Sequence, residues 1–122
     1  MKITIKNLPP SKNKYVNWHW AKRKRYHEEV RDEIWVEMVN QNIKNCKPLK
    51  KAKIIFRLYF KDNRRRDVQN YLGGGIIAIL DSLVDLGIIA DDSYDIIRQP
   101  VVEFYKNKDD PRCEIEIRNN HI

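Results

Sequence analysis

Residues 52–60 of the chain, AKIIFRLYF, place a large apolar side chain at every second position. The side-chain period of a β-strand is two, so these apolar residues share one face of a strand. Aromatic and β-branched residues also favour the pleated conformation. The stretch therefore predicts a strand whose core face carries Ile54, Phe56, Leu58 and Phe60 and whose other face carries Ile55, Arg57 and Tyr59.

The segment before this strand predicts a shorter strand, a loop and a helix. Residues 2–7 alternate Ile3 and Ile5 with polar residues, and Pro9 and Pro10 end this strand because proline cannot donate to a β-ladder. Residues 11–20 are expected to form a polar and aromatic loop. A helix is expected over about residues 21–41, because apolar residues recur there at the spacing of one helical face: Tyr26, Val30, Ile34 and Met38.

The segment after the strand predicts a second helix and two further strands. The helix runs from residue 69 or 70 to residue 85 or 86, with Gly87 as its stop, and its buried stripe is Leu72, Ile76, Ile79 and Leu83. Residues 96–105 are expected to form a strand that is broken near Pro100, and residues 113–118 a fourth strand joined to it by a hairpin turn at 106–111. The last two strands would then be antiparallel neighbours, and crossovers between parallel strands right-handed.

The element order β-α-β-α-β-β predicts a single α+β domain over residues 1–122, a mixed sheet with two helices packed on one face. One feature is anomalous within the second helix. Gly73, Gly74 and Gly75 would cost a helix roughly 2–3 kcal/mol relative to alanines. Either the first turn is irregular, or another segment approaches the backbone closely there. The glycines lack the Lys-Ser/Thr ending of a phosphate-binding loop.

The charge of the chain favours a polyanionic partner. The net charge is +7, and residues 1–27 contain no acid while they carry eight basic residues: Lys2, Lys6, Lys12, Lys14, Lys22, Arg23, Lys24 and Arg25. A solvated basic surface is the alternative. No apolar run reaches the length of a membrane span, so no membrane partner and a cytoplasmic location are expected. Cys46 and Cys113 are interpreted as free thiols, since no secretion signal is recognised. Their spacing to His19, His27 and His121 does not suit a structural zinc site.

A candidate site combines arginines and aspartates. Arg64, Arg65 and Arg66 suit phosphate oxygens, and Asp67 follows them directly. Asp91 and Asp92 lie beyond the second predicted helix, and aspartates suit a hard cation such as Mg²⁺. The return from Gly87 to Asp92 spans up to about 20 Å, enough to reach Asp67 within one chain. A second subunit could supply one half instead. Taken separately, these stretches are also typical of a solvated turn and a helix cap.

Two other clusters have both a functional and a structural interpretation. In the loop at 11–20, Lys12, Asn13 and Lys14 could contact phosphates while Trp18 and Trp20 stack on bases. The tryptophans could equally anchor the loop to the core. The basic first turn of the following helix opposes the helix dipole, so the residues from Lys22 to Arg25 are expected to serve a partner, with Arg23 and Arg25 on DNA. Asp81 and Asp85 are expected on a solvated helix face.

Four blocks of sequence together resemble the RusA-type Holliday-junction resolvases. The blocks are Pro9-Pro10-Ser11-Lys12-Asn13, Arg65-Arg66-Asp67-Val68-Gln69-Asn70, Leu80-Asp81-Ser82-Leu83 and Gly87-Ile88-Ile89-Ala90-Asp91-Asp92-Ser93. The resemblance extends over most of the chain. It implies an α/β fold, an intertwined homodimer, Mg²⁺ and paired symmetric nicks in branched DNA. The metal-binding aspartates of the family map onto Asp67, position 69 and Asp92.

Two positions depart from the family pattern. Gln69 stands where the family has an aspartate, and the glycines occupy the region of a family lysine. The first hypothesis is a Mg²⁺-dependent endonuclease on Holliday junctions, with Asp67 and Asp92 catalytic, Gln69 and Asp91 as further metal ligands, and Asn70 beside the arginines on DNA. The second is a non-catalytic protein that binds branched DNA on the same fold. The third is a basic protein that binds RNA or a protein partner.

Overall fold

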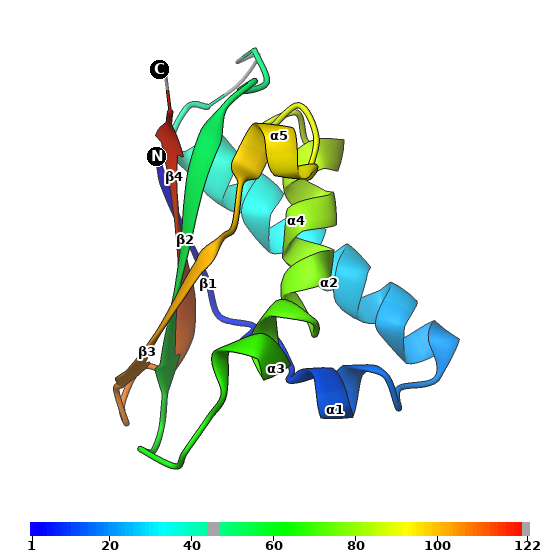
Figure 1. Cartoon of the computed structure of the whole chain (residues 1–122), viewed down its shortest axis with the longest axis vertical. Coiled ribbons are helices and arrows are strands. Elements are labelled where there is room, and N and C mark those ends of the chain that lie inside the picture. Colours follow the sequence, from blue (N-terminus) through cyan, green and yellow to red (C-terminus); the bar gives the residue numbers. More distant parts are fainter. Residues whose placement is uncertain (44–46, 121–122) are drawn as a thin grey trace.

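The chain folds into one sheet with all of its helices on one side (Figure 1). The computed structural model describes residues 1–43 and 47–120. The sheet has the strand order β1 (Lys2–Ile5), β4 (Arg112–Asn119), β2 (Ala52–Phe60) and β3 (Val101–Lys106). The helices are α1 (Lys12–Tyr15), α2 (Trp20–Asn40), α3 (Val68–Leu72), α4 (Ile76–Asp85) and α5 (Tyr94–Ile97). The α+β class with a mixed sheet, predicted from the sequence, is confirmed.

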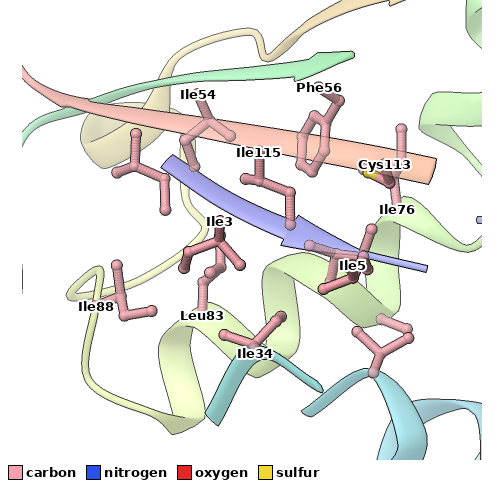
Figure 2. Packing of buried hydrophobic residues seen from close by; sticks show 14 of the residues in the cluster. Ile3, Ile5, Ile34, Ile54, Phe56, Ile76, Leu83, Ile88, Cys113 and Ile115 are labelled. Carbon is pink, nitrogen blue, oxygen red and sulfur yellow. The ribbon is translucent and has the colours of Figure 1, made fainter. Parts of the chain in front are cut away.

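Strand β2 is the predicted strand, and it lies inside the sheet. It pairs parallel with β3 and antiparallel with β4, while β1 pairs antiparallel with β4. The predicted core face is correct, because Ile54, Phe56 and Leu58 are fully buried. They meet the apolar faces of α2 and α4, where the predicted residues Val30, Ile34, Ile76, Ile79 and Leu83 are also buried. Figure 2 shows Ile34 and Leu83 reaching toward the strands that carry Ile3, Ile54 and Ile115.

The predicted hairpin between the last two strands is wrong. β3 and β4 are not neighbours, because β2 lies between them. The connection at 107–111 carries the chain past the end of β2, where the Asn107 amide donates to the Phe60 carbonyl at 2.8 Å. The side chains on the other face of β2 fit this order, because Arg57 pairs with Glu103 of β3 at 3.0 Å and with Glu116 of β4 at 2.9 Å.

The predicted second helix is two helices, separated at Gly73–Gly75. Both predicted consequences of the glycines are present. A Cβ built on Gly74 would lie 2.4 Å from the Pro10 carbonyl oxygen, and one on Gly75 would lie 2.2 Å from Pro10 Cδ. The Gly75 amide also donates to the Pro10 carbonyl at 2.9 Å. The segment after β1 is therefore seated directly on the glycines. Gly87, with φ of +76°, follows α4 as predicted.

Two segments differ from the sequence prediction because short helices replace a loop and a strand. In the predicted loop at 11–20, Ser11 caps α1, with its hydroxyl accepting from the Lys14 amide at 3.5 Å. His19 caps α2 through Nδ1, which accepts from the Ala21 amide at 3.3 Å. The predicted third strand starts only at Val101, because α5 occupies Tyr94–Ile97 and Arg98 follows it with φ of +53°.

Cys113 is a buried free thiol, as predicted, and burial raises its pKa. The prediction that Cys46 is a free thiol concerns a residue outside the described residues. Among the helices of residues 1–43 and 47–120, none has the length and apolar character needed to cross a membrane.

Candidate functional site

A groove of about 870 Å³ opens between three segments that are far apart in the sequence. We call it the basic groove. One wall is the segment between β1 and α1, the second is α2, and the third is the segment between β2 and α3. Its lining residues are Asn7, Leu8, Pro9, Pro10, Ser11, Lys14, Trp18, Lys22, Arg25, Tyr26, Glu29, Phe60, Arg64, Arg65, Arg66, Asp67, Asn70 and Tyr71. Six of these are cationic and two are anionic, so the groove favours a polyanion.

The α2 wall of the basic groove consists of one helical face. Lys22, Arg25, Tyr26 and Glu29 stand at spacings of three, four and seven residues, which place side chains on one side of a helix. Lys22 and Arg25 are exposed, whereas Tyr26 is buried beneath them. The basic first turn of this helix, which opposes the helix dipole, therefore faces the groove. Arg23 does not: its guanidinium lies 5.9 Å from the Tyr15 ring centroid, and it lines neither cavity.

The three consecutive arginines have different environments. Arg66 is only 13% exposed; it donates to Asp62 at 2.8 Å and lies 3.7 Å above the Phe60 ring. Arg64 is largely exposed and pairs with the same carboxylate at 3.2 Å. Hydrogen bonds from the Arg66 guanidinium and the Arg64 amide hold the pKa of Asp62 below its ordinary value. Arg66 therefore fixes the loop, in addition to lining the basic groove with Arg64 and Arg65.

Arg65 is the arginine that remains available to a ligand. It is exposed and makes no hydrogen bond or ion pair with any residue of the described chain. Lys14 and Arg25 also line the basic groove, so the predicted loop and helix cations meet the arginine run in one place.

A smaller cavity of about 580 Å³ lies beside the basic groove. It is lined by Lys12, Asn13, Asp67, Val68, Gln69 and Asn70. Asp67 and Asn70 line both cavities and form a ridge between them. Asp67 precedes α3 as its N-cap residue, but its carboxylate makes no capping hydrogen bond and is exposed. The ridge thus presents a carboxylate and an amide between the basic groove and a smaller polar cavity whose cationic lining residue is Lys12.

Asp91 and Asp92 lie apart from this ridge. They precede α5, and Figure 1 shows α3 and α5 at opposite ends of α4. They line neither cavity. The chain after α4 is held by hydrogen bonds to Leu49. The Leu49 amide donates to the Ile88 carbonyl at 3.0 Å, and the Ala90 amide donates to the Leu49 carbonyl at 2.9 Å. Buried Ile88 and Ile89 anchor that path. Asp92 comes close enough to α4 to act electrostatically on Asp81, but it lines neither of the cavities that Asp67 lines.

Asp81 is less solvated than predicted. His27 Nδ1 lies 4.0 Å from its carboxylate, and the other ring nitrogen lies 2.6 Å from the Tyr15 hydroxyl. Burial raises the pKa of Asp81, against the effect of His27, with Asp92 and Asp85 adding to the increase. Asp85 is exposed, as expected for a solvated face.

The side chains around Asp67 decide whether a metal ion could bind there. Within residues 1–43 and 47–120, no three or more His, Cys, Asp or Glu side chains gather where a metal ion could bind. Asp67 and Gln69 do line the small cavity together. Mg²⁺ often takes only one or two carboxylates, with waters and substrate phosphates completing its shell, so this oxygen donor pair fits the ion.

Sequence reasoning did not identify Tyr26, Glu29 or Asp62 as part of the candidate site. The helical spacing from Lys22 through Arg25 to Glu29 could have predicted the shared face. No local pattern could have assigned Asp62 to Arg66. Comparisons of the chain with protein-family models and with curated proteins found no match.

Proposed function

We propose that this protein is a Mg²⁺-dependent endonuclease that binds Holliday junctions or other branched DNA and acts as a homodimer. The observation that supports the proposal most strongly is the ridge of Asp67 and Asn70 between the basic groove and the small cavity. A phosphodiester backbone that crosses the ridge has the cations of the groove on one side, Lys12 on the other side and a carboxylate beneath it. A two-fold dimer would present one such ridge to each of two opposed strands of a junction.

The roles follow from the environments of the side chains. Arg65, Lys14 and Arg25 neutralise phosphates, because they are exposed and line the basic groove. Arg66 keeps the loop in place through Asp62 and the Phe60 ring. Asp67 and Gln69 would hold Mg²⁺ against the phosphate. When bound, the ion would polarise the phosphoryl oxygen and lower the pKa of a coordinated water.

Asp92 lines neither cavity beside Asp67, which favours a site completed by the second copy of the chain. The experiment is cleavage of a labelled four-way junction with Mg²⁺, compared with EDTA. Asp67→Asn and Asp92→Asn should each abolish nicking. A mixture of the two variants should regain part of the activity, because one mixed-dimer site would carry both native aspartates. Cleavage that survives both single substitutions would refute the assignment.

The second candidate is a branched-DNA-binding protein without nuclease activity. It is favoured by Gln69, whose neutral amide attracts Mg²⁺ less than a carboxylate does. It predicts junction binding without nicking and with a steep salt dependence. If about five phosphates are neutralised, log Kd should change by about 4–5 per tenfold change in salt. A gain of nicking by Gln69→Asp would show a weakened active site. Equal affinity for RNA and linear duplex would instead favour a general basic binding protein.

A further inference from the structure

Trp18 and Trp20 are close in sequence but occupy different surroundings. Trp20 is 66% exposed at the start of α2 and lines neither cavity; its ring lies against His19, with centroids 5.4 Å apart. Trp18 lines the basic groove. The more exposed indole is therefore outside the site, and the partly buried one is inside it. This separates the stacking and anchoring interpretations of the two residues.

The Trp18 ring is held in place by neighbouring aromatic side chains. Tyr26 meets it edge to face at 5.5 Å between centroids, and Tyr15 lies tilted against it at 5.9 Å. Because both tyrosines are buried, the indole has little freedom to turn. A rigid ring at the wall of a cavity loses little conformational entropy when a planar ligand stacks on it.

A cation occupies the face of this ring. Lys22 Nζ lies 4.5 Å from the Trp18 centroid, and the lysine is exposed on the groove wall. A cation–π contact at an exposed site contributes only about 0.5–1 kcal/mol. A phosphate offers the ammonium a full opposite charge, and a nucleobase offers the indole a larger stacking surface. Both the Lys22 ammonium and the Trp18 indole make a stronger contact if a nucleotide enters. Lys22 would then bind the phosphate, and the base would cover the indole face that Lys22 leaves.

The two cavities differ in what they can bind. The basic groove has aromatic lining residues besides its cations, including Trp18, Phe60 and Tyr71. The small cavity on the other side of the ridge has none among its lining residues, only polar side chains and Val68. A base can stack on one side of the ridge, whereas only the backbone finds partners on the other.

We propose that Trp18 stacks an unpaired DNA base in the basic groove, while the backbone of the same strand crosses Asp67–Asn70 into the small cavity. Lys22 leaves the indole face and binds the adjacent phosphate. The proposal rests on the proposed function in requiring DNA in the groove, but it does not require cleavage. It makes the ligand a branched DNA with at least one unstacked nucleotide beside the contacted phosphate.

The test uses Trp18 itself as the reporter. In the variant Trp20→Phe/Trp35→Phe, Trp18 is the remaining tryptophan. The probe is a branched DNA with two unpaired nucleotides at the branch, added in EDTA so that no cleavage occurs. Its matched control carries abasic residues at those two positions. We expect quenching of Trp18 with the first probe and none with the second, and about tenfold weaker binding of the abasic probe.

Substitution gives an independent readout. Trp18→Leu should weaken binding of the intact probe about tenfold and leave the abasic probe unaffected. Trp20→Leu, the matched control, should change neither affinity. DNA binding with unchanged Trp18 emission, or equal affinity for the two probes, would overturn the stacking proposal while leaving the proposed function intact. Absence of any binding to branched DNA would overturn both.

Discussion

Gly74→Ala is expected to destabilise the protein strongly although the backbone at residue 74 is not left-handed. The added Cβ would meet three backbone atoms: the Pro10 carbonyl oxygen at 2.4 Å, the Lys12 nitrogen at 2.7 Å and the Ser11 carbonyl carbon at 2.7 Å. None of these belongs to a side chain that can rotate away. The contact must open, which costs about 1–3 kcal/mol for overpacking. Loss of the hydrogen bond from Gly75 to Pro10 adds about 1 kcal/mol.

The expected loss is therefore about 2–4 kcal/mol, measured as the free energy of unfolding in urea by circular dichroism. Gly73→Ala is the matched control. Its Cβ would meet Lys12 Cδ at 3.2 Å, and that part of a flexible side chain can move. Alanine is also the better helix former, so this variant should lie within about 1 kcal/mol of the wild type.

DNA binding should also be weakened more by Gly74→Ala than by Gly73→Ala. Pro10 and Ser11 line the basic groove. Opening their contact with Gly74 would therefore move the wall between β1 and α1 away from the wall between β2 and α3. In buffer without urea, where both variants are folded, Gly74→Ala should bind branched DNA more weakly than Gly73→Ala. The reasoning fails if Gly74→Ala is as stable as the wild type, or if the two alanine variants lose equal stability.

Three further predictions concern single side chains. Arg65→Ala should weaken DNA binding and lower the salt slope by about one, whereas Arg66→Ala should lower the urea midpoint because it frees the loop from Asp62. Hydrogen bonds from its arginine neighbours hold the pKa of Glu116 below the unfolded value of about 4.3. That stabilisation is complete above this pH and is lost as the pH falls through the folded-state pKa, so the urea midpoint should fall on acidification, and less so in Glu116→Gln. The Tyr26 hydroxyl is buried without a hydrogen-bond partner among the described residues, so Tyr26→Phe should raise the free energy of unfolding by up to about 1 kcal/mol.

The core of the fold could be predicted because its signals are local. The alternation in β2 and the helical repeat from Tyr26 to Met38 each lie within one element, and burial follows that periodicity. The cost of three glycines in a helix also predicted a close approach at that point. The sequence could not name Pro10 as the approaching residue, since nothing local connects residue 10 with residue 75.

The candidate site could be predicted only as separate parts. Lys14, Arg25 and Arg65 were each identified from charge and spacing, and the fold brings them to one groove. Arg65 and Arg66 cannot be distinguished by sequence, because their difference comes from Asp62 and the Phe60 ring lying beneath one of them. Trp18 and Trp20 are separated in the same way, by which of them faces Tyr26.

The sequence alone determined the long helix α2, the strands β1, β2 and β4 and the buried face of β2, because hydrophobic periodicity acts over a few residues. It did not predict the short helices α1 and α5, which are too short to show such a period. Only the tertiary structure decided the order of the strands, the joining of two cavities at Asp67, and the position of Asp92 outside both cavities. These features depend on contacts between residues far apart in the chain, such as Arg57 with Glu103 and Glu116, or Leu49 with Ile88. Such contacts are selected by the free energy of the whole packed chain.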